Sequence, residues 1–235
     1  MIRSKTVIFG GLTALALASA LPTALAGAST AAAVNSIDAG YAVALKGGSE
    51  TYSGVVKVPT VTCTSSDTGI LLIGEDISDT LSSESAGEVA LEIGMACSGT
   101  TPLYGATINI NGTTTKFGST VSAGDTLSFT ASASSSKATG KVTDKTTSKS
   151  TSAKGAGGTL KAVIVGAGGI SHNWPTFDKI VFSKVMLNGK TLSSTKPTQT
   201  NAAVMVSGNW VTEITSSALN KSGDGFQDTY VTNNP

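Results

Sequence analysis

Short apolar segments with the alternation or the length of β-strands recur along most of the chain. Clusters of Gly, Pro, Asn and Ser separate them, and outside the N-terminal segment none shows the sustained 3.6-residue period of an amphipathic helix. The pattern predicts strands at 52–61, 69–74, 88–93, 103–110, 126–133, 160–165, 179–187 and 202–214. Many short strands with turns between them are typical of a sandwich or barrel, so we predict an all-β fold.

Turn signals mark several connections between these strands. Asn-Gly pairs at 111–112 and 188–189 are typical of hairpin turns, because both residues tolerate a positive φ. The segment "SAGDT" at 122–126 is a further turn signal. The stretch 134–158 is rich in Ser, Thr, Lys and Gly and poor in bulky apolar residues, so we expect a long solvated hairpin or a mobile loop there.

The first residues have the features of a secretory signal peptide. Two basic residues precede an apolar run at 7–21, and Ala-Leu-Ala at 24–26 fits the cleavage rule. An N-terminal anchor is the alternative, but the apolar run is short for a span of roughly 20 residues. We therefore expect a signal peptide over 1–26 and one domain over 27–235, secreted and not attached to a membrane after cleavage.

Charge and cysteine content narrow the class of protein further. The formal net charge is +1 and charged residues make up 13% of the chain, so there is no basic field to hold nucleic acid. We expect a monomer with no nucleic-acid partner. Cys63 and Cys97 are the two cysteines, and in an exported chain they predict one disulfide. It would close a loop of about 35 residues and contribute roughly 3–4 kcal/mol.

Most familiar catalytic and cofactor sites are excluded by counting. His172 is the single histidine, so a three-histidine zinc site is impossible, and no GxSxG motif accompanies it for a Ser-His-Asp triad. The "GAGG" at 166–169 lacks the third glycine of a dinucleotide fingerprint, and no helical pattern follows it. We expect no metal site and no cofactor.

Carboxylates are the remaining candidate chemistry. Glu75, Asp76 and Asp79 cluster after an apolar strand, while Glu88 and Glu92 have the even spacing that places both on one face. Paired acids on a sheet could perform acid–base hydrolysis. The alternative is a solvated edge whose charges face water, and the residues alone favour that alternative.

Seven segments, read in order, form a familiar series. They are "AGYAV" (39–43), "YSGVVKVPTVTCT" (52–64), "LLIGED" (71–76), "CSGTTPLYGA" (97–106), "VSAGDTLSFTAS" (121–132), "KAVIVGAGG" (161–169) and "FDKIVFSKVMLNGK" (177–190). Together they resemble the glutamic peptidases, or eqolisins, in their bacterial form. The resemblance implies a concanavalin-like sandwich of two curved antiparallel sheets. It also implies a secreted endopeptidase that works at acid pH.

The resemblance further implies a catalytic Gln and Glu on the concave sheet face. The carboxylate would activate water, and the amide would stabilise the oxyanion. Residue by residue, that pair is absent from this chain. The Gln position falls at Glu92 or within a residue or two of it, and the two Glu positions of the later strand fall at Ala162 and Gly166. The core positions of the family are kept, whereas the reactive ones are not.

The cleft positions of the family are also altered. The two tryptophan positions fall at Asp38 and Leu72, and the aromatic strand falls near 106–108. Asp76 and Tyr104 remain from the cleft. The sequence therefore indicates a scaffold that is kept without most of its substrate-lining aromatic residues.

Three functions follow from these observations. The first, which we favour, is a catalytically degenerate protein that binds peptide or cell-surface material. The second is a divergent acid endopeptidase that uses Glu92 with Asp76 or another carboxylate beside it, since two close acids share a proton. The third is a surface carbohydrate-binding or structural protein, which rests only on the analogy of fold and on a Ser/Thr/Gly-rich exterior.

Overall fold

The structure is a computed structural model that describes residues 34–36, 38–78, 88–158, 160–170, 173–206 and 209–231. The expected signal peptide at 1–26 lies outside these residues, as do Asp79 and His172. The strands in the first half are β1 (Val34–Ser36), β2 (Asp38–Ala44), β3 (Glu50–Lys57), β4 (Val61–Thr62), β5 (Ile70–Ser78), β6 (Val89–Ser98), β7 (Thr101–Ile110), β8 (Thr113–Lys116) and β9 (Thr126–Ala133).

The second half continues in the same way, with a single 3-10 turn among its described residues. Its elements are β10 (Ala138–Asp144), β11 (Lys149–Gly155), β12 (Ala162–Ile170), β13 (Thr176–Phe177), β14 (Lys179–Leu187), β15 (Lys190–Thr191), η1 (Leu192–Thr195), β16 (Thr198–Val206), β17 (Asn209–Ser216) and β18 (Phe226–Tyr230). None of the described residues form a helix long and apolar enough to cross a membrane.

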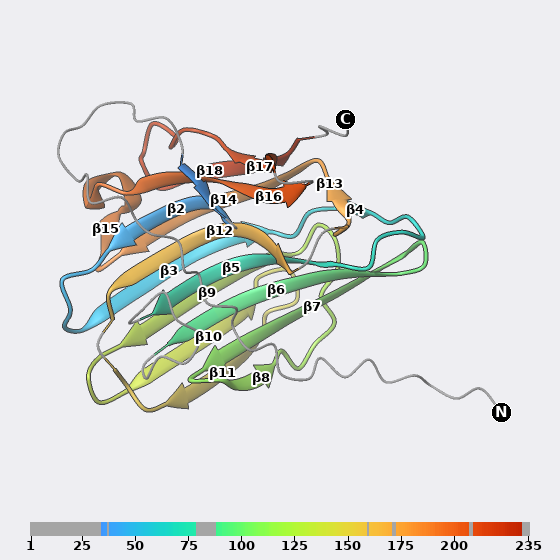
Figure 1. Ribbon diagram of the computed structural model, residues 1–235. Coiled ribbons are helices and arrows are strands. Elements are labelled where there is room, and N and C mark those ends of the chain that lie inside the picture. The colour runs from blue at the N-terminus through green and yellow to red at the C-terminus, as the bar shows by residue number, and fades with distance from the viewer. Residues whose placement is uncertain are drawn as a thin grey trace.

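Two antiparallel layers enclose the core. One layer has the order β2-β12-β5-β6-β7-β8, and the other has the order β11-β10-β9-β3-β14 (Figure 1). Strands β18, β17 and β16 continue the pairing from β14 to β2, so the layers are joined along one side. The short β1 pairs with β16 in parallel. The predicted all-β, two-sheet sandwich is confirmed.

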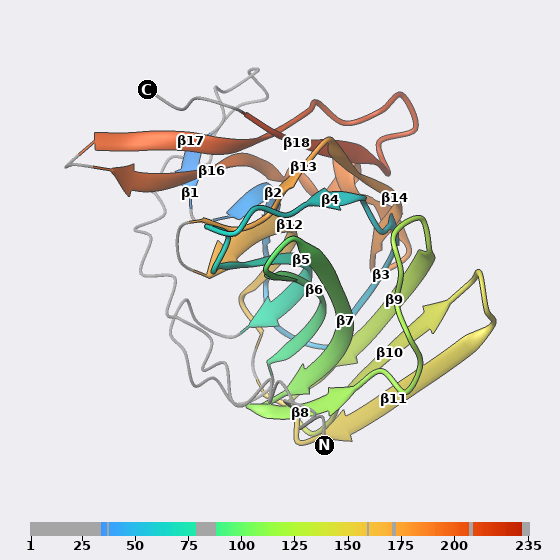
Figure 2. The ribbon, with the colours of Figure 1, turned by 90° about the vertical axis from the view of Figure 1, so that its right-hand side faces the viewer.

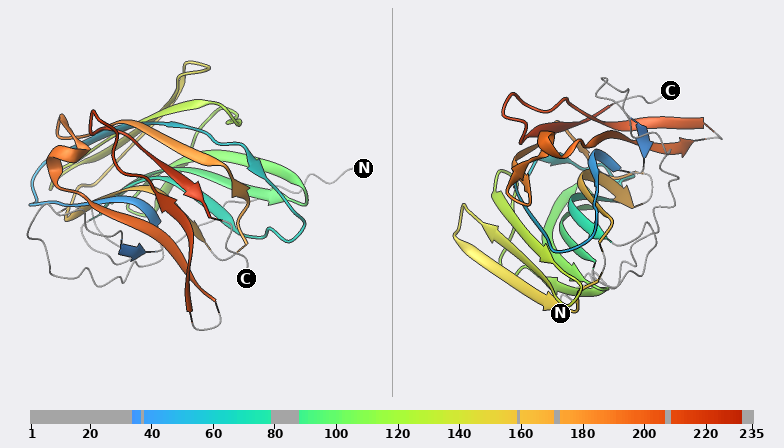
Figure 3. Two further views of the ribbon diagram at one scale, coloured as in Figure 1. Left: turned by 90° about the horizontal axis from the view of Figure 1, so that it is seen from above. Right: turned by 90° about the vertical axis from the view of Figure 1, so that its left-hand side faces the viewer.

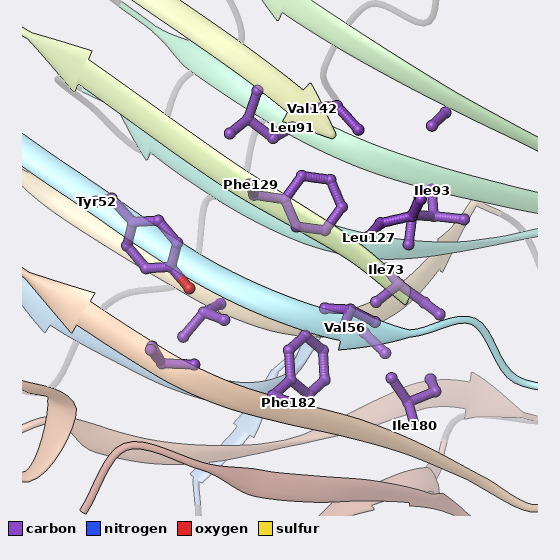
Figure 4. Packing of buried hydrophobic residues seen from close by; sticks show 14 of the residues in the cluster. Tyr52, Val56, Ile73, Leu91, Ile93, Leu127, Phe129, Val142, Ile180 and Phe182 are labelled. Atoms are coloured by element: carbon purple, nitrogen blue, oxygen red, sulfur yellow. The ribbon is translucent and has the colours of Figure 1, made fainter. Parts of the chain in front are cut away.

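The two layers pack through alternate residues of their strands. Leu127 and Phe129 of β9 point inward and are fully buried, as are Leu91 and Ile93 of β6. Figure 4 shows these side chains meeting between the sheets. The residues between them point outward, as the period of two in a strand requires. Burial of these large apolar side chains is the main force that holds the layers together.

The first layer is strongly curved, whereas the hairpins at its margins project outward. Strands β5, β6 and β7 are strongly bent, with their convex side toward β10, which packs against β6 and β7 (Figure 2). The β10–β11 hairpin and the β16–β17 hairpin extend from opposite corners of the molecule (Figure 3). This arrangement leaves each layer with one face turned away from the core.

The predicted strands agree with the structure in places and differ in others. The predicted strands 126–133 and 179–187 have the bounds of β9 and β14. The single strand predicted at 202–214 is wrong, since the chain forms the antiparallel pair β16 and β17 there. The strand predicted at 52–61 ends at Lys57 because Pro59, just beyond, has no N–H to donate to a ladder.

The turn predictions are confirmed by the backbone angles. Asn111 and Gly112 have φ values of 52° and 76°, and Asn188 and Gly189 have values of 52° and 72°. Both pairs have the two positive φ angles of a type I′ hairpin turn. The polar stretch 134–158 contains β10 and β11, which pair from Ala138–Gly155 to Asp144–Lys149. The hairpin alternative is therefore the correct one.

The predicted disulfide is present. Cys63, just after β4, is bonded to Cys97 near the end of β6, with 5.7 Å between their Cα atoms. The bond connects the segment that leads into β5 with the strand that pairs with β5. It therefore closes a loop of 34 residues around the first curved hairpin of the layer.

Candidate functional site

The outward face of the curved layer carries a row of glycines that ends in a carboxylate. Gly40 of β2 lies opposite Gly166 of β12, Gly166 lies opposite Gly74 of β5, and Gly74 lies opposite Glu92 of β6. Directly paired residues of antiparallel strands share a face, so these four positions form one line across the sheet. We call Gly40, Gly166 and Gly74 the glycine strip.

Close approach of neighbouring backbones explains why the strip is glycine. A Cβ atom at Gly166 would lie 1.7 Å from the carbonyl oxygen of Ala39, and one at Gly40 would lie 2.0 Å from that of Val165. A Cβ atom at Gly74 would lie 2.2 Å from the carbonyl oxygen of Leu91. Gly40 also has a φ of +127°, which other residues rarely adopt. No side chain can therefore occupy the strip, in which Gly40 and Gly166 are buried and Gly74 is half-buried.

Glu92 stands at the end of the strip and is half-buried. The Thr107 hydroxyl of β7, directly opposite, donates a hydrogen bond of 3.4 Å to its Oε2. Burial raises the pKa of Glu92, the nearby charges of Glu88 and Asp38 raise it further, and the Thr107 hydroxyl partly opposes the rise. Glu88 is only 7% exposed. The expected solvated edge is therefore wrong for this pair, because the curved sheet takes both acids out of water.

Asp38 is the second carboxylate of this face. It is the first residue of β2 and lies opposite Gly168 of β12, one row of outward residues from the strip. Burial of its carboxyl raises its pKa to about 6. The negative charge of Asp38 raises the pKa of Glu92, although strands β12 and β5 lie between the two residues. Curvature of the sheet brings the two acids within electrostatic reach of each other.

Two buried polar atoms on the same face have no hydrogen-bond partner. One is the Oγ1 of Thr200, which lies opposite Gly40 at the far end of the strip. The other is the Oδ1 of Asn109, two residues from Thr107 on β7. Both atoms can therefore bind water or a polar group of a ligand. Together with Glu92 they place hydrogen-bonding groups at both ends of the strip.

The positions that the resemblance assigns to catalytic glutamates lie on this face. Val163 and Val165 point into the core with exposures of 1% and 0%, so Ala162 and Gly166 point the other way. Gly166 shares its row with Glu92, as described above, and Ala162 lies two rows further along, opposite Ser78. Neither carries a group that can transfer a proton.

The predicted cleft residues are divided between the two faces. Asp38 and Leu72 share a row on the outward face, because both lie opposite Gly168. Tyr104 lies opposite the fully buried Met95 and packs against the core, so its cleft assignment is not supported. Its hydroxyl accepts a hydrogen bond from the Val61 amide at 3.2 Å. Tyr104 therefore has a structural contact in the core.

Asp76 keeps its place in the sheet, on β5 between Ile164 and Ala90. Both partners belong to the outward face, which puts the Asp76 position in the row next to the glycine strip. The side chain of Asp76 lies outside the described part of the structure.

A third perturbed acid lies beneath the face, inside the molecule. Asp228 of β18 is fully buried, and the Ser216 hydroxyl donates a 2.6 Å hydrogen bond to its Oδ1. Burial raises the pKa of Asp228 to about 7, and the charge of Asp38 adds to the rise, while the Ser216 hydroxyl and the Ala167 amide oppose it. The charge of Asp228 in turn contributes to the raised pKa of Tyr41, after burial of the phenol itself.

The arrangement of strands has counterparts among solved structures. A scytalidoglutamic peptidase bound to a peptide-based transition-state analogue superposes with a TM-score of 0.62 and 17% identity, over 83% of this chain and 98% of that one. SCP-B, an eqolisin in complex with the tripeptide Ala-Ile-His, superposes with a TM-score of 0.61 and 16% identity over the same shares. The chain has the glutamic-peptidase fold.

The sequence itself is far from these peptidases. No protein-family model matches it, and no curated protein matches it either. At 16–17% identity, the structural likeness establishes the fold and not the activity. The function of the outward face therefore depends on its own residues.

Several residues of the face were missed by sequence reasoning. Thr200 sits in a polar stretch that gives no sign of its position, whereas Thr107 and Asn109 alternate with apolar residues in the predicted strand 103–110, which was a signal that they face away from the core. The glycines did give a signal, since Gly40, Gly74 and Gly166 each interrupt an otherwise apolar strand. A glycine inside a strand often marks close backbone approach. Within the part of the chain that the structure describes, no group of three or more His, Cys, Asp or Glu residues could hold a metal ion.

Proposed function

We propose that this protein is a secreted, catalytically degenerate member of the glutamic-peptidase fold, of the bacterial type, that binds an extended peptide along the glycine strip without cleaving it. One observation carries the proposal. On one side of Glu92 its row continues with Gly74 and Gly166, and on the other side its neighbour is Thr107. The row therefore holds one hydroxyl beside the carboxyl, and neither the Gln amide nor the second carboxyl that the resemblance implies for catalysis. A row with this composition supports binding better than hydrolysis.

The chemistry of the face suits a polypeptide. Where the strip is partly exposed, at Gly74, the absence of a side chain lets another backbone approach closely, and the polar atoms at the ends of the strip complement a peptide's own groups. The Asn109 Oδ1 can accept a hydrogen bond from a peptide N–H, whereas the Thr200 hydroxyl can donate one to a peptide carbonyl. Glu92 adds a further acceptor at the same end as Asn109.

A side chain placed on the open part of this face should block binding. A Cβ atom at Gly94, in the row next to the strip, would meet only the Leu72 side chain at 3.8 Å, so Gly94→Phe can be accommodated. We expect Gly94→Phe to weaken binding of fluorescein-labelled oxidised insulin B chain by at least about tenfold, which corresponds to one lost contact of about 1.4 kcal/mol. Fluorescence anisotropy measures the change.

Thr130→Phe is the matched control for this variant. Thr130 is exposed on the outward face of the other layer, so the same side chain is added at a distance from the strip. It should bind the labelled chain as the wild type does. Equal affinity of Gly94→Phe and wild type, with both variants folded by circular dichroism, would show that the strip is not the peptide site.

A divergent acid hydrolase is the second candidate, because Glu92 and Asp38 interact and both have raised pKa values. A carboxyl with a raised pKa can act as a general acid or base in mildly acidic solution. In that case Glu92→Gln would abolish hydrolysis while peptide binding persisted. The two candidates thus differ in whether any cleavage occurs.

A further inference from the structure

The outward face of the second layer has an unusual composition. Its strands β3, β9, β10, β11 and β14 alternate between core residues and residues that face away from the core. The outward positions with a hydroxyl are Thr51, Ser53, Thr126, Ser128, Thr130, Ser132, Thr139, Thr143, Ser150, Ser152 and Ser183. The remaining outward positions are Val55, Lys57, Lys141, Lys154, Lys179, Val181 and Met186, and the exposed Lys184 lies at the irregularity of β14 between Ser183 and Met186. We call this surface the hydroxyl–lysine face.

No carboxylate occupies any of these outward positions, although the whole chain has 15 acidic residues against 16 basic ones. The two acids within the five strands point inward. Glu50 is 6% exposed and receives a hydrogen bond from the Asn188 amide, and Asp144 is fully buried and hydrogen-bonded to Thr146 and Thr147. Acids at the margin lie in the turns before β9 and β14, at Asp125 and Asp178. The charge of the face is therefore positive only.

The lysines of the face occur in two pairs. Lys141 and Lys154 are diagonal neighbours on β10 and β11, and Lys57 and Lys179 are diagonal neighbours on β3 and β14. Diagonal positions of an antiparallel pair lie about 7–8 Å apart. All four side chains are exposed. Between the pairs lie rows of hydroxyl groups, so the face offers separated positive charges and a field of hydrogen-bonding groups.

We propose that the hydroxyl–lysine face is a docking surface for an anionic polysaccharide, a glycan whose sugar units carry carboxylate groups. The lysine pairs complement the carboxylates, and the Ser and Thr hydroxyls both donate to and accept from sugar hydroxyls. The proposal does not depend on the peptide-binding role, because the two surfaces belong to different layers.

The same composition argues against a nucleic acid. No outward position of the face carries an aromatic ring on which a base could stack. Arg3 is the one arginine of the sequence, so the bidentate contacts that favour phosphate are absent from this face. Two separated lysine pairs among hydroxyls fit a polymer with spaced charges and many hydroxyl groups.

Binding of the full protein to sodium polygalacturonate tests the proposal. We expect binding that weakens as salt is added and that is lost with fully methyl-esterified polygalacturonate, which keeps the sugar chain but not its charge. Isothermal titration calorimetry measures both. Absence of binding to polygalacturonate, or equal binding to the esterified polymer, would overturn the proposal.

Two variants locate the site. Lys141→Gln/Lys154→Gln should weaken binding about tenfold, as expected for two exposed charge contacts. Lys46→Gln/Lys196→Gln removes the same charge from exposed lysines elsewhere and should leave the affinity unchanged. Equal weakening by the two double variants would show that net charge alone drives binding and would overturn the proposal.

One further variant tests the charge of the face, and two other ligands test its specificity. Thr130→Glu places a carboxylate in the centre of the face and should abolish binding while the circular dichroism spectrum stays native. Double-stranded DNA and phosphatidylserine vesicles, used at the same salt concentration, should bind at least about tenfold more weakly than polygalacturonate. Equal or tighter binding of either one would assign the face to that partner and contradict the glycan proposal.

Discussion

Gly166→Ala is expected to destabilise the protein by at least about 4 kcal/mol, which places it among the most severe classes of substitution. The added Cβ atom would lie 1.7 Å from the carbonyl oxygen of Ala39 and 2.8 Å from the Cα atom of Gly40. Both are backbone atoms, so no side chain can move aside, and β2 and β12 would have to separate. Urea unfolding followed by tryptophan fluorescence measures the loss.

Gly105→Ala is the matched control for this substitution. Gly105 is also an outward glycine of the curved layer, but no atom lies within 4 Å of a Cβ atom built there. Its stability should stay within about 0.5 kcal/mol of wild type. If Gly166→Ala and Gly105→Ala were equally stable, the close approach of β2 and β12 would be wrong.

The same geometry bears on the positions that the resemblance assigns to family glutamates. The resemblance places them at Ala162 and Gly166, and the backbone around Gly166 leaves no room for any side chain. Gly166→Glu would therefore disrupt the pairing of β2 with β12 and would not place a carboxylate on the face.

The protein is expected to be more stable in acid than at neutral pH, chiefly because of Asp228. Its pKa is raised to about 7 in the folded state from an ordinary value of 3.8, mainly by burial. The folded state therefore holds a proton that the unfolded chain releases, and stability falls as the pH rises between those values. A shift of this size corresponds to about 4 kcal/mol, present in full below about pH 4 and lost above about pH 7.

Four other acids also make the stability of the protein depend on pH. Asp38 and Glu92 also have raised pKa values and act in the same direction as Asp228. Hydrogen bonds lower the pKa values of Asp144 and Asp224, so their contributions are lost as the pH falls below the ordinary range. We therefore expect the stability maximum at about pH 4, with the steeper decline on the neutral side.

Asp228→Asn separates Asp228 from the other acids. Asparagine keeps an acceptor for the Ser216 hydroxyl but carries no charge. In urea unfolding, the variant should lose most of the stability difference between about pH 4 and about pH 8. Asp178→Asn, at an exposed position, should keep the wild-type profile. A profile of Asp228→Asn parallel to the wild type would show that Asp228 does not titrate in this range.

Much of the fold could be predicted because strand periodicity and turn chemistry are local properties. Alternation gave the bounds of β9 and β14, and Asn-Gly pairs gave two hairpin turns. The disulfide followed from the count and the expected compartment of Cys63 and Cys97. Short strands such as β2 and β18 were missed because a few alternating residues next to glycine carry little signal.

The candidate site was less predictable because it depends on register between distant strands. Sequence reasoning pointed to Glu92 and, through the resemblance, to Ala162 and Gly166, but it did not show which residues share a row with them. Alternation in β18 places Asp228 on the same face as the buried Phe226, which is a signal of burial that could have been read. The polar atoms of Asn109 and Thr200 become significant only through pairing and curvature.

Digestion of oxidised insulin B chain in acid tests the central claim that this face binds peptides without cleaving them. Purified wild type and Glu92→Gln would be incubated with the chain at a series of acidic pH values, where a carboxyl with a raised pKa can transfer protons. New peptide ends would be identified by mass spectrometry. We predict that both proteins bind the chain and that neither produces new ends. Cleavage by the wild type that disappears in Glu92→Gln would contradict the claim and assign hydrolysis to Glu92.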